Sequence, residues 1–135
     1  MPTVGVFAVI TDETGRIICV HHDYGDRCWT LPGGGMEPHE SPIDALEREV
    51  REETGYIVQA GRLIGIYSTP WKDDLVLAFA ATILDRDPWE PNAEIAEVGF
   101  FPLDNLPEPF SSRALHRISE ALSDTPGVVH VFASK

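Results

Sequence analysis

The sequence predicts an α/β fold, in which a mixed β-sheet carries helices on its two faces and forms an α/β/α sandwich. Apolar residues recur at helical spacing in two segments, 42–54 and 111–122. Several other runs are rich in β-branched and aromatic residues, a composition typical of strands. Because strands and helices interleave without a strict strand–helix–strand rhythm, we expect a mixed sheet rather than an all-parallel one.

The composition fits one compact domain covering residues 1–135. A hydrophobic content of 43% is enough for a core. A length of 135 residues leaves no room for a second domain. The net charge of −12 opposes unassisted binding to nucleic acid or to anionic membranes, so we expect neither as a partner. No apolar run reaches the length of a membrane span.

Cysteine usage and the start of the chain predict a cytoplasmic location. Cys19 and Cys28 are too few for a disulfide framework or a zinc site. No charged segment followed by an apolar one comes after Met1, as it would in a secretory leader. We therefore expect the protein in a reducing cytosol.

Two strands are predicted at the start, over 3–11 and 16–22, with a turn at 12–15 between them. His21 and His22 close the second strand. Neighbouring strand residues point to opposite faces, so this pair cannot easily share a metal ion. We interpret both as exposed histidines at a strand end.

A short strand over 28–31 leads into a glycine turn at 32–35. Arg27 and Trp29 stand just before this turn. The guanidinium could hold a phosphate, and the indole could stack on a substrate or pack in the core. Glycines followed by a helix also let the backbone approach a ligand closely.

The strongest local signal is a capped helix over 42–54. Ser41 can cap its first turn, and Asp44 completes the capping pattern. Pro42 suits the first helical position, and Gly55 is placed to end the helix.

This helix has an apolar stripe beside an acidic one. The stripe expected to face the core consists of Ile43, Leu46 and Val50. The neighbouring acidic stripe consists of Glu49, Glu52 and Glu53. Like charges at these spacings cost roughly 0.2–0.5 kcal/mol per pair. Arg48 can pair with Glu52, and Arg51 with Glu47, but Glu49 and Glu53 have no basic residue four positions away, so we expect a cation from solution.

The spacing of these residues resembles the Nudix box. The match runs from Gly34 to Tyr56 and includes Glu40, the Arg48-Glu49-Val50 run, Glu52, Glu53 and Gly55. Only the last position departs from the pattern, where Tyr56 replaces an aliphatic residue, and we expect a packing adjustment there. The resemblance supports the same sandwich fold.

The resemblance also implies roles for individual residues. The Gly33 carbonyl would ligate metal, Gly34 would lie against the substrate, and Glu40 would orient Arg48. In some relatives a fourth metal-binding glutamate precedes an aromatic residue near the end of the domain, and that position falls on Glu94, with Glu97 as the competitor. A solvated acidic loop over 85–97 is the alternative.

Oxygen ligands select Mg²⁺, or Mn²⁺ as a substitute, over zinc. Because Mg²⁺ commonly uses one or two protein carboxylates, this many glutamates predict at least two ions once substrate is bound. Water would attack phosphorus in a nucleoside diphosphate linked to another moiety, a small-molecule substrate. The catalytic residues and metal ligands would be Glu49, Glu52 and Glu53, with the general base left open among these and Glu94.

The segments after the helix complete the sheet. Strands are predicted over 57–68 and 75–84, the second as a buried central strand, and a third over 98–103. Between the first two, Trp71 and Lys72 could meet a base and a phosphate, or be solvated loop residues. Arg27 or Lys72 could stabilise developing negative charge.

The chain ends with a helix over 111–122 and an apolar segment over 128–133. The helix is expected to pack on the sheet through Ala114, Leu115, Ile118 and Leu122. The last segment could be an edge strand or a tail on a partner subunit, so a homodimer is possible.

Two functional hypotheses remain open on this basis. The first is a hydrolase. The second is a catalytically silent Nudix-fold domain that senses nucleotides or binds protein. The substrate stays unassigned, because Tyr67 and Pro70 do not match the family's specificity markers.

Overall fold

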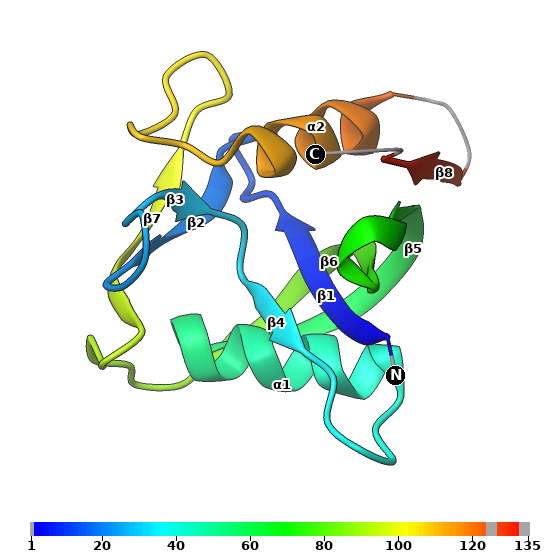
Figure 1. The fold of residues 1–135 in the computed structure, drawn as a ribbon. Coiled ribbons are helices and arrows are strands. Elements are labelled where there is room, and N and C mark those ends of the chain that lie inside the picture. The colour runs from blue at the N-terminus through cyan, green and yellow to red at the C-terminus, as the bar shows by residue number, and fades with distance from the viewer. Residues whose placement is uncertain (1, 124–126, 133–135) are drawn as a thin grey trace.

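The computed structural model describes residues 2–123 and 127–132, and its centre is a five-stranded sheet (Figure 1). Two pairs of strands, β1 with β6 and β5 with β8, run parallel, and the other two pairs run antiparallel. The sheet is therefore mixed, as predicted. In spatial order its strands are β4 (Gly33–Gly35), β1 (Thr3–Ile10), β6 (Asp74–Arg86), β5 (Tyr56–Thr69) and β8 (Val128–Val131).

A smaller antiparallel sheet and two helices complete the fold. Helix α1 (Pro42–Thr54) and helix α2 (Ser112–Leu122) lie on opposite faces of the five-stranded sheet (Figure 1). The short helix η1 (Pro70–Lys72) joins β5 to β6. The predicted α/β/α arrangement is confirmed. The smaller sheet consists of β3 (Trp29–Thr30), β2 (Ile17–His22) and β7 (Ile95–Phe101).

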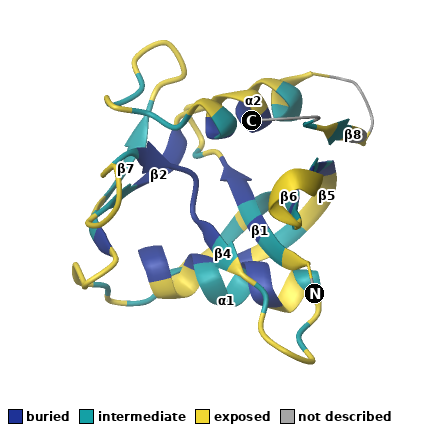
Figure 2. Cartoon of the chain, viewed as in Figure 1, coloured by how far each residue is buried: buried dark blue, intermediate teal, exposed yellow. Residues whose placement is uncertain are grey.

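Each helix covers its own hydrophobic core. In β1, Val6 and Ala8 pack toward α1, whereas Val9 packs toward α2. This alternation is the two-residue period of a strand buried on both faces. Figure 2 shows the buried segments along β1 and along the inner side of each helix.

Helix α1 has the predicted bounds and caps. The Ser41 Oγ accepts the Asp44 N–H at 3.0 Å, and Gly55 takes a left-handed φ of 79°. The expectation that Ile43 faces the core was wrong, because its side chain is 47% exposed. Ala45 and Glu53 are both buried, so the buried face is rotated toward the acidic stripe and away from Ile43.

The predicted glycine turn was also wrong, because residues 33–35 form strand β4. Gly33 pairs with Phe7 of β1, and Gly35 pairs with Gly5. A Cβ at Gly33 would clash with the carbonyl oxygen of Val6. Glycine is needed here for close approach of two strands rather than for a reversal of the chain.

Strand β6 is central, as predicted, but is buried mainly in its first half. Leu84 is 62% exposed, and the strand continues to Arg86, where it pairs with Tyr56. The acidic loop is shorter than predicted, since β7 begins at Ile95. Tyr56 packs edge-on against Phe100 at 5.7 Å, which is the packing adjustment expected at the last position of the box.

The apolar stripe of α2 was only half correct. Ala114 and Ile118 are buried, whereas Leu115 and Leu122 are 44% and 56% exposed. Arg117 is buried in their place, with its guanidinium carbon 4.7 Å from the ring centroid of Phe7. A cation–π contact of this kind explains how an arginine enters an aromatic core.

Two further predictions concern the histidines and the end of the chain. His21 and His22 are half-buried rather than exposed, because their rings stack on Trp29 and Tyr24.

Strand β8 pairs parallel with β5, which confirms the edge strand, while Ala133 lies outside the described residues. Within residues 2–123 and 127–132, neither helix has the length and apolar character needed to cross a bilayer.

Candidate metal centre on helix α1

Glu53 is a buried carboxyl group between α1 and the glycine strand. The residue is 6% exposed, and its Oε1 accepts the Gly33 N–H at 2.8 Å. Burial raises the pKa of Glu53 to about 8, and the neighbouring Glu49, Glu94 and Glu52 add to the effect. A cation beside this carboxylate would stabilise its charged form and so oppose both effects on its pKa.

Glu49 lies directly against the glycine strand. A Cβ built on Gly34 would stand 2.5 Å from the Glu49 Cδ. Burial raises the pKa of Glu49 as well. The second glycine of the run therefore leaves the room that the Glu49 carboxylate occupies.

Arg48 connects the acidic groups of this helix. Its Nε and Nη2 donate to the two carboxylate oxygens of Glu40 at 2.7 and 2.9 Å, and this contact lowers the pKa of Glu40 to about 2. Its Nη1 donates to Glu49 at 3.0 Å and to Glu52 at 3.2 Å. The contact between Glu40 and Arg48 is the one that the resemblance implied.

Two expectations about charge pairing need correction. Arg48 partly neutralises Glu49, so a cation from solution is not its sole counter-ion. Arg51 pairs with Asp87, and Glu47 accepts the Ala60 N–H at 3.0 Å. Within the described residues no ion pair joins Glu47 to Arg51, because the sheet and the following loop offer each a partner.

The loop before β7 brings Glu94 to the acidic stripe. A cavity of about 270 Å³ is lined by Glu52, Glu53 and Glu94, together with Asn92, Ala93 and Ile95. The Asn92 Oδ1 holds this loop by accepting the N–H groups of Glu94 and Ile95, each at 2.9 Å. Glu97 instead lies 3.7 Å from His21 on the smaller sheet. The geometry thus favours Glu94 over Glu97.

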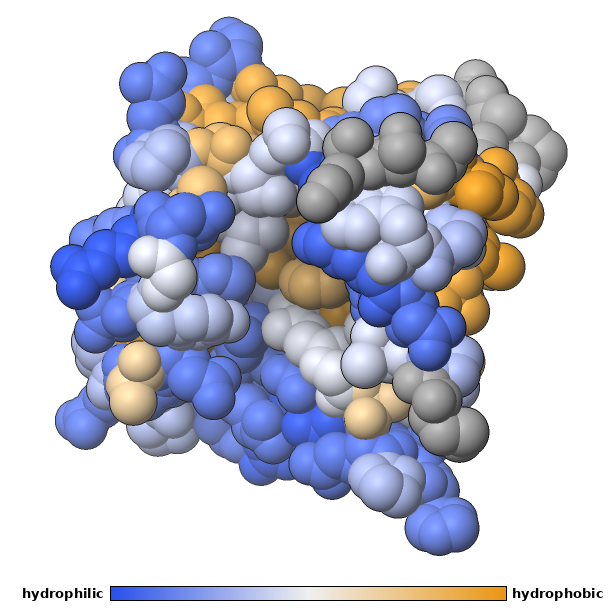
Figure 3. All heavy atoms as spheres, viewed as in Figure 1, coloured by the Kyte–Doolittle hydropathy of each residue, from blue (hydrophilic) through white to orange (hydrophobic). Residues whose placement is uncertain are grey.

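The donor set fits a hard divalent cation. Carboxylate oxygens from α1 and from the loop before β7 line one cavity, and the β4 backbone passes beside Glu49 and Glu53. Figure 3 shows hydrophilic residues gathered over the part of the surface where α1 lies. Oxygen ligands of this kind suit Mg²⁺ or Mn²⁺.

The other predicted substrate residues do not line this cavity in the described part of the chain. Trp29 is 8% exposed and stacks on His21 at 4.7 Å, so the structure favours its packing interpretation. Arg27 has a left-handed φ of 55°, and its carbonyl accepts from His21. The Lys72 Nζ lies 5.0 Å from the centroid of the Trp71 ring. Both residues belong to η1, just before the start of β6.

A second cavity contains basic residues that the sequence interpretation missed. Arg117 is 6% exposed, and within the described residues its Nε is buried without a hydrogen-bond partner. Arg113, four residues earlier, donates to the Thr69 Oγ1 at 3.2 Å. The signal available in the sequence was a pair of arginines four residues apart on one predicted helix of an acidic chain. The cavity, of about 230 Å³, is lined by Phe7, His22, Asp26, Cys28, Thr30, Ser111, Arg113 and Arg117.

Comparison with known proteins identifies the family of the chain. The profile of the NUDIX domain matches residues 1–121. The chain is 34% identical over 113 residues to an ADP-ribose pyrophosphatase of Methanocaldococcus jannaschii, covering 79% of the chain and 66% of that protein. It is 43% identical over 75 residues to the human diphosphoinositol polyphosphate phosphohydrolase 3-alpha, covering 53% of the chain and 44% of that protein.

The chain therefore spans less than two thirds of the length of these curated relatives. Among solved structures, an ADP-ribose pyrophosphatase from Streptococcus suis superposes with a TM-score of 0.77 at 27% identity, covering 96% of this chain and 99% of that one. The sandwich fold agrees with these matches. The chain belongs to the Nudix family.

Proposed function

We propose that this protein is a Mg²⁺-dependent hydrolase, for which Mn²⁺ can substitute, that cleaves a phosphoanhydride bond in a nucleoside diphosphate linked to another moiety. The observation that carries the proposal is the buried Glu53, which shares one cavity with Glu52 and Glu94. A buried carboxylate among other carboxylates costs stability in its ionised form unless a cation binds there. The same observation argues against a catalytically silent domain.

The residues that would hold the ions are Glu49, Glu52, Glu53 and Glu94, with the carbonyl of Gly33. Such ions polarise phosphate oxygens and lower the pKa of an attacking water. Arg48 positions the Glu49 and Glu52 carboxylates, and Glu40 in turn holds Arg48. One carboxylate of the cluster takes the proton of the water that attacks phosphorus.

The arginine cavity supports an anionic substrate. Arg117 has a buried Nε available as a donor, and Arg113 lines the same cavity. His22 belongs to this cavity and interacts electrostatically with Glu94, so the two cavities are neighbours. We propose that the pyrophosphate lies near the carboxylates while Arg117 and Arg113 bind a polar part of the attached moiety.

The first substrate to test is ADP-ribose, within the class of nucleoside diphosphate derivatives. Two relatives with broad coverage of this chain carry that activity in their names. A panel that also contains nucleoside triphosphates, dinucleoside polyphosphates and nucleotide sugars, with product analysis, defines the specificity. Release of a nucleotide and a phosphorylated product is the expected outcome.

The test of the metal centre is Glu53→Gln. The amide oxygen can still accept the Gly33 N–H, so circular dichroism should remain unchanged. Mg²⁺-dependent turnover should fall by at least about 10²-fold, because a ligand and candidate base is lost. The matched control is Glu47→Gln on the same helix, which keeps an acceptor for Ala60 and should retain activity. Equal rates in Glu53→Gln and the native protein would refute the assignment.

A further inference from the structure

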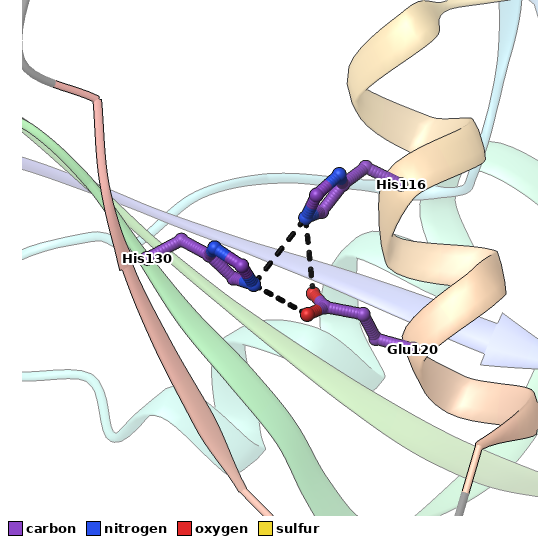
Figure 4. A group of neighbouring side chains, drawn as sticks. All are labelled: His116, Glu120 and His130. Atoms are coloured by element: carbon purple, nitrogen blue, oxygen red, sulfur yellow. Dashed lines mark hydrogen bonds and ion pairs between the residues drawn. The ribbon is translucent and has the colours of Figure 1, made fainter. Parts of the chain in front are cut away.

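A second cluster of metal-ligating side chains lies on the other face of the sheet. His116 and Glu120 are one turn apart on α2, and His130 comes from β8 (Figure 4). One ligand atom from each residue lies within 4.8 Å of the other two. None of these residues belongs to the Nudix box or lines the two cavities described above.

The ligand atoms lie close enough together to share one metal ion. The Nε2 atoms of His116 and His130 are 3.3 Å apart, and the His116 Nε2 lies 3.5 Å from the Glu120 Oε1. The His130 Nε2 also contacts the Glu120 Oε2. Metal–ligand bonds of about 2.0–2.1 Å in a tetrahedron place neighbouring ligand atoms roughly 3.3 Å apart.

The three side chains can offer lone pairs to a cation as well as hydrogen bonds to each other. A carboxylate only accepts, and each neutral imidazole Nε2 either donates or accepts. If the His130 Nε2 carries the proton that Glu120 accepts, the His116 Nε2 either accepts from the same group or donates to the Glu120 Oε1. A cation among the three side chains would take one lone pair from each of them.

Tyr67 holds the cluster in place. Its hydroxyl donates to the Glu120 Oε1 at 2.6 Å, and the residue is 2% exposed. Its ring stacks on His130 at 5.7 Å and meets His116 edge-on at 6.1 Å. Groups that orient metal ligands from behind in this way raise the affinity of a site. The imidazoles remain partly exposed, which leaves a side open for entry and for a water ligand.

We propose that His116, Glu120 and His130 form a zinc site, separate from the Mg²⁺ centre on α1, which fastens β8 to α2. Two imidazoles and one carboxylate suit Zn²⁺, whereas an oxygen-only set suits Mg²⁺. Strand β8 pairs with β5 from Gly65 to Ser68, and an ion between β8 and α2 would strengthen the existing contact of His130 with Glu120. The proposed site uses no cysteine, so it does not conflict with the low cysteine count.

Zinc binding is measured by titration calorimetry on metal-free protein, with excess Mg²⁺ present to occupy the α1 centre. One Zn²⁺ per chain should bind, and the melting temperature should rise by about 5 °C at saturating zinc. His130→Ala and Glu120→Gln should each weaken zinc binding by at least about 10-fold and remove the thermal shift. In Glu120→Gln the amide oxygen can still accept from Tyr67, so the fold is retained.

The control variant is His39→Asn, which removes an exposed histidine at a left-handed φ of 65° that asparagine tolerates. It should bind zinc as the native protein does. Mg²⁺-dependent turnover should be unchanged in His130→Ala, which separates this site from the hydrolase. A native crystal soaked in zinc should show the ion among the three side chains. Absence of binding, or binding that survives both ligand substitutions, would overturn the proposal.

Discussion

Helices α1 and α2 cover opposite faces of one sheet and begin in the same way, yet they bury side chains of opposite charge. Each is capped by a serine, with Ser41 accepting from Asp44 and Ser111 from Ala114. Each also buries one charged side chain that is 6% exposed, Glu53 on α1 and Arg117 on α2.

Burial affects these two groups in opposite directions. It raises the pKa of Glu53 to about 8 and lowers the pKa of Arg117 to about 10. In both cases burial disfavours the charged form of the side chain. A ligand of opposite charge would stabilise that charged form at each site. The comparison is in line with our proposal that α1 binds cations and that α2 binds a polar part of the substrate, and the following predictions test that division.

The largest expected effect is on enzyme kinetics, where substitutions on the two helices should change different parameters. Glu53→Gln should reduce kcat, as described above, whereas Arg117→Met should raise KM by about 10-fold with a smaller change in kcat. Methionine keeps most of the buried volume but cannot donate to a phosphate or a sugar. Steady-state kinetics on the preferred substrate measures both. A fall in kcat with unchanged KM in Arg117→Met would contradict the division.

The next effect tests the contact between the glycine strand and α1. Gly34→Ala places a methyl group where the Glu49 carboxylate lies, so activity should fall by about 10- to 100-fold. The fold should survive, because the displaced atoms are the end of a flexible side chain. Gly35→Ala is the control, since its Cβ meets no described atom within 4 Å. Equal activities in the two variants would show that the position of Glu49 does not matter.

The smallest effect is the pH dependence of stability without metal. Because the folded pKa of Glu53 lies above its unfolded value, the folded state holds this proton more tightly. The stabilisation from this bound proton is complete below the ordinary glutamate pKa of 4.5 and is lost as pH rises toward about 8. The loss is at most about 1.4 kcal/mol per pH unit.

Urea unfolding in EDTA at several pH values measures this loss. The stability of the native protein relative to Glu53→Gln should fall as pH rises across that window, and Mg²⁺ should reverse the fall because it binds the ionised form. Parallel curves for the two proteins would mean that Glu53 does not titrate in this range.

Local signals account for what could be predicted about α1. Its caps, bounds and acidic stripe depend on residues within one or two turns of each other, and the contact of Glu40 with Arg48 follows the spacing of the box. The exposure of Ile43 could not be obtained in this way, since it depends on how the helix is rotated against the sheet. The same limit applies to Leu115 and Arg117 on α2.

Sequence alone determined the Nudix family, the order of the two helices and the longer strands, and the identity of the carboxylates on α1, because these depend on short spacings and on the chemistry of side chains. The tertiary structure decided which distant residues join them. It placed Glu94 rather than Glu97 beside Glu53, made a strand of Gly33–Gly35, and brought His130 to His116 and Glu120. Those outcomes depend on strand pairing and on which face of each helix meets the sheet, and both are set by contacts between residues far apart in the chain.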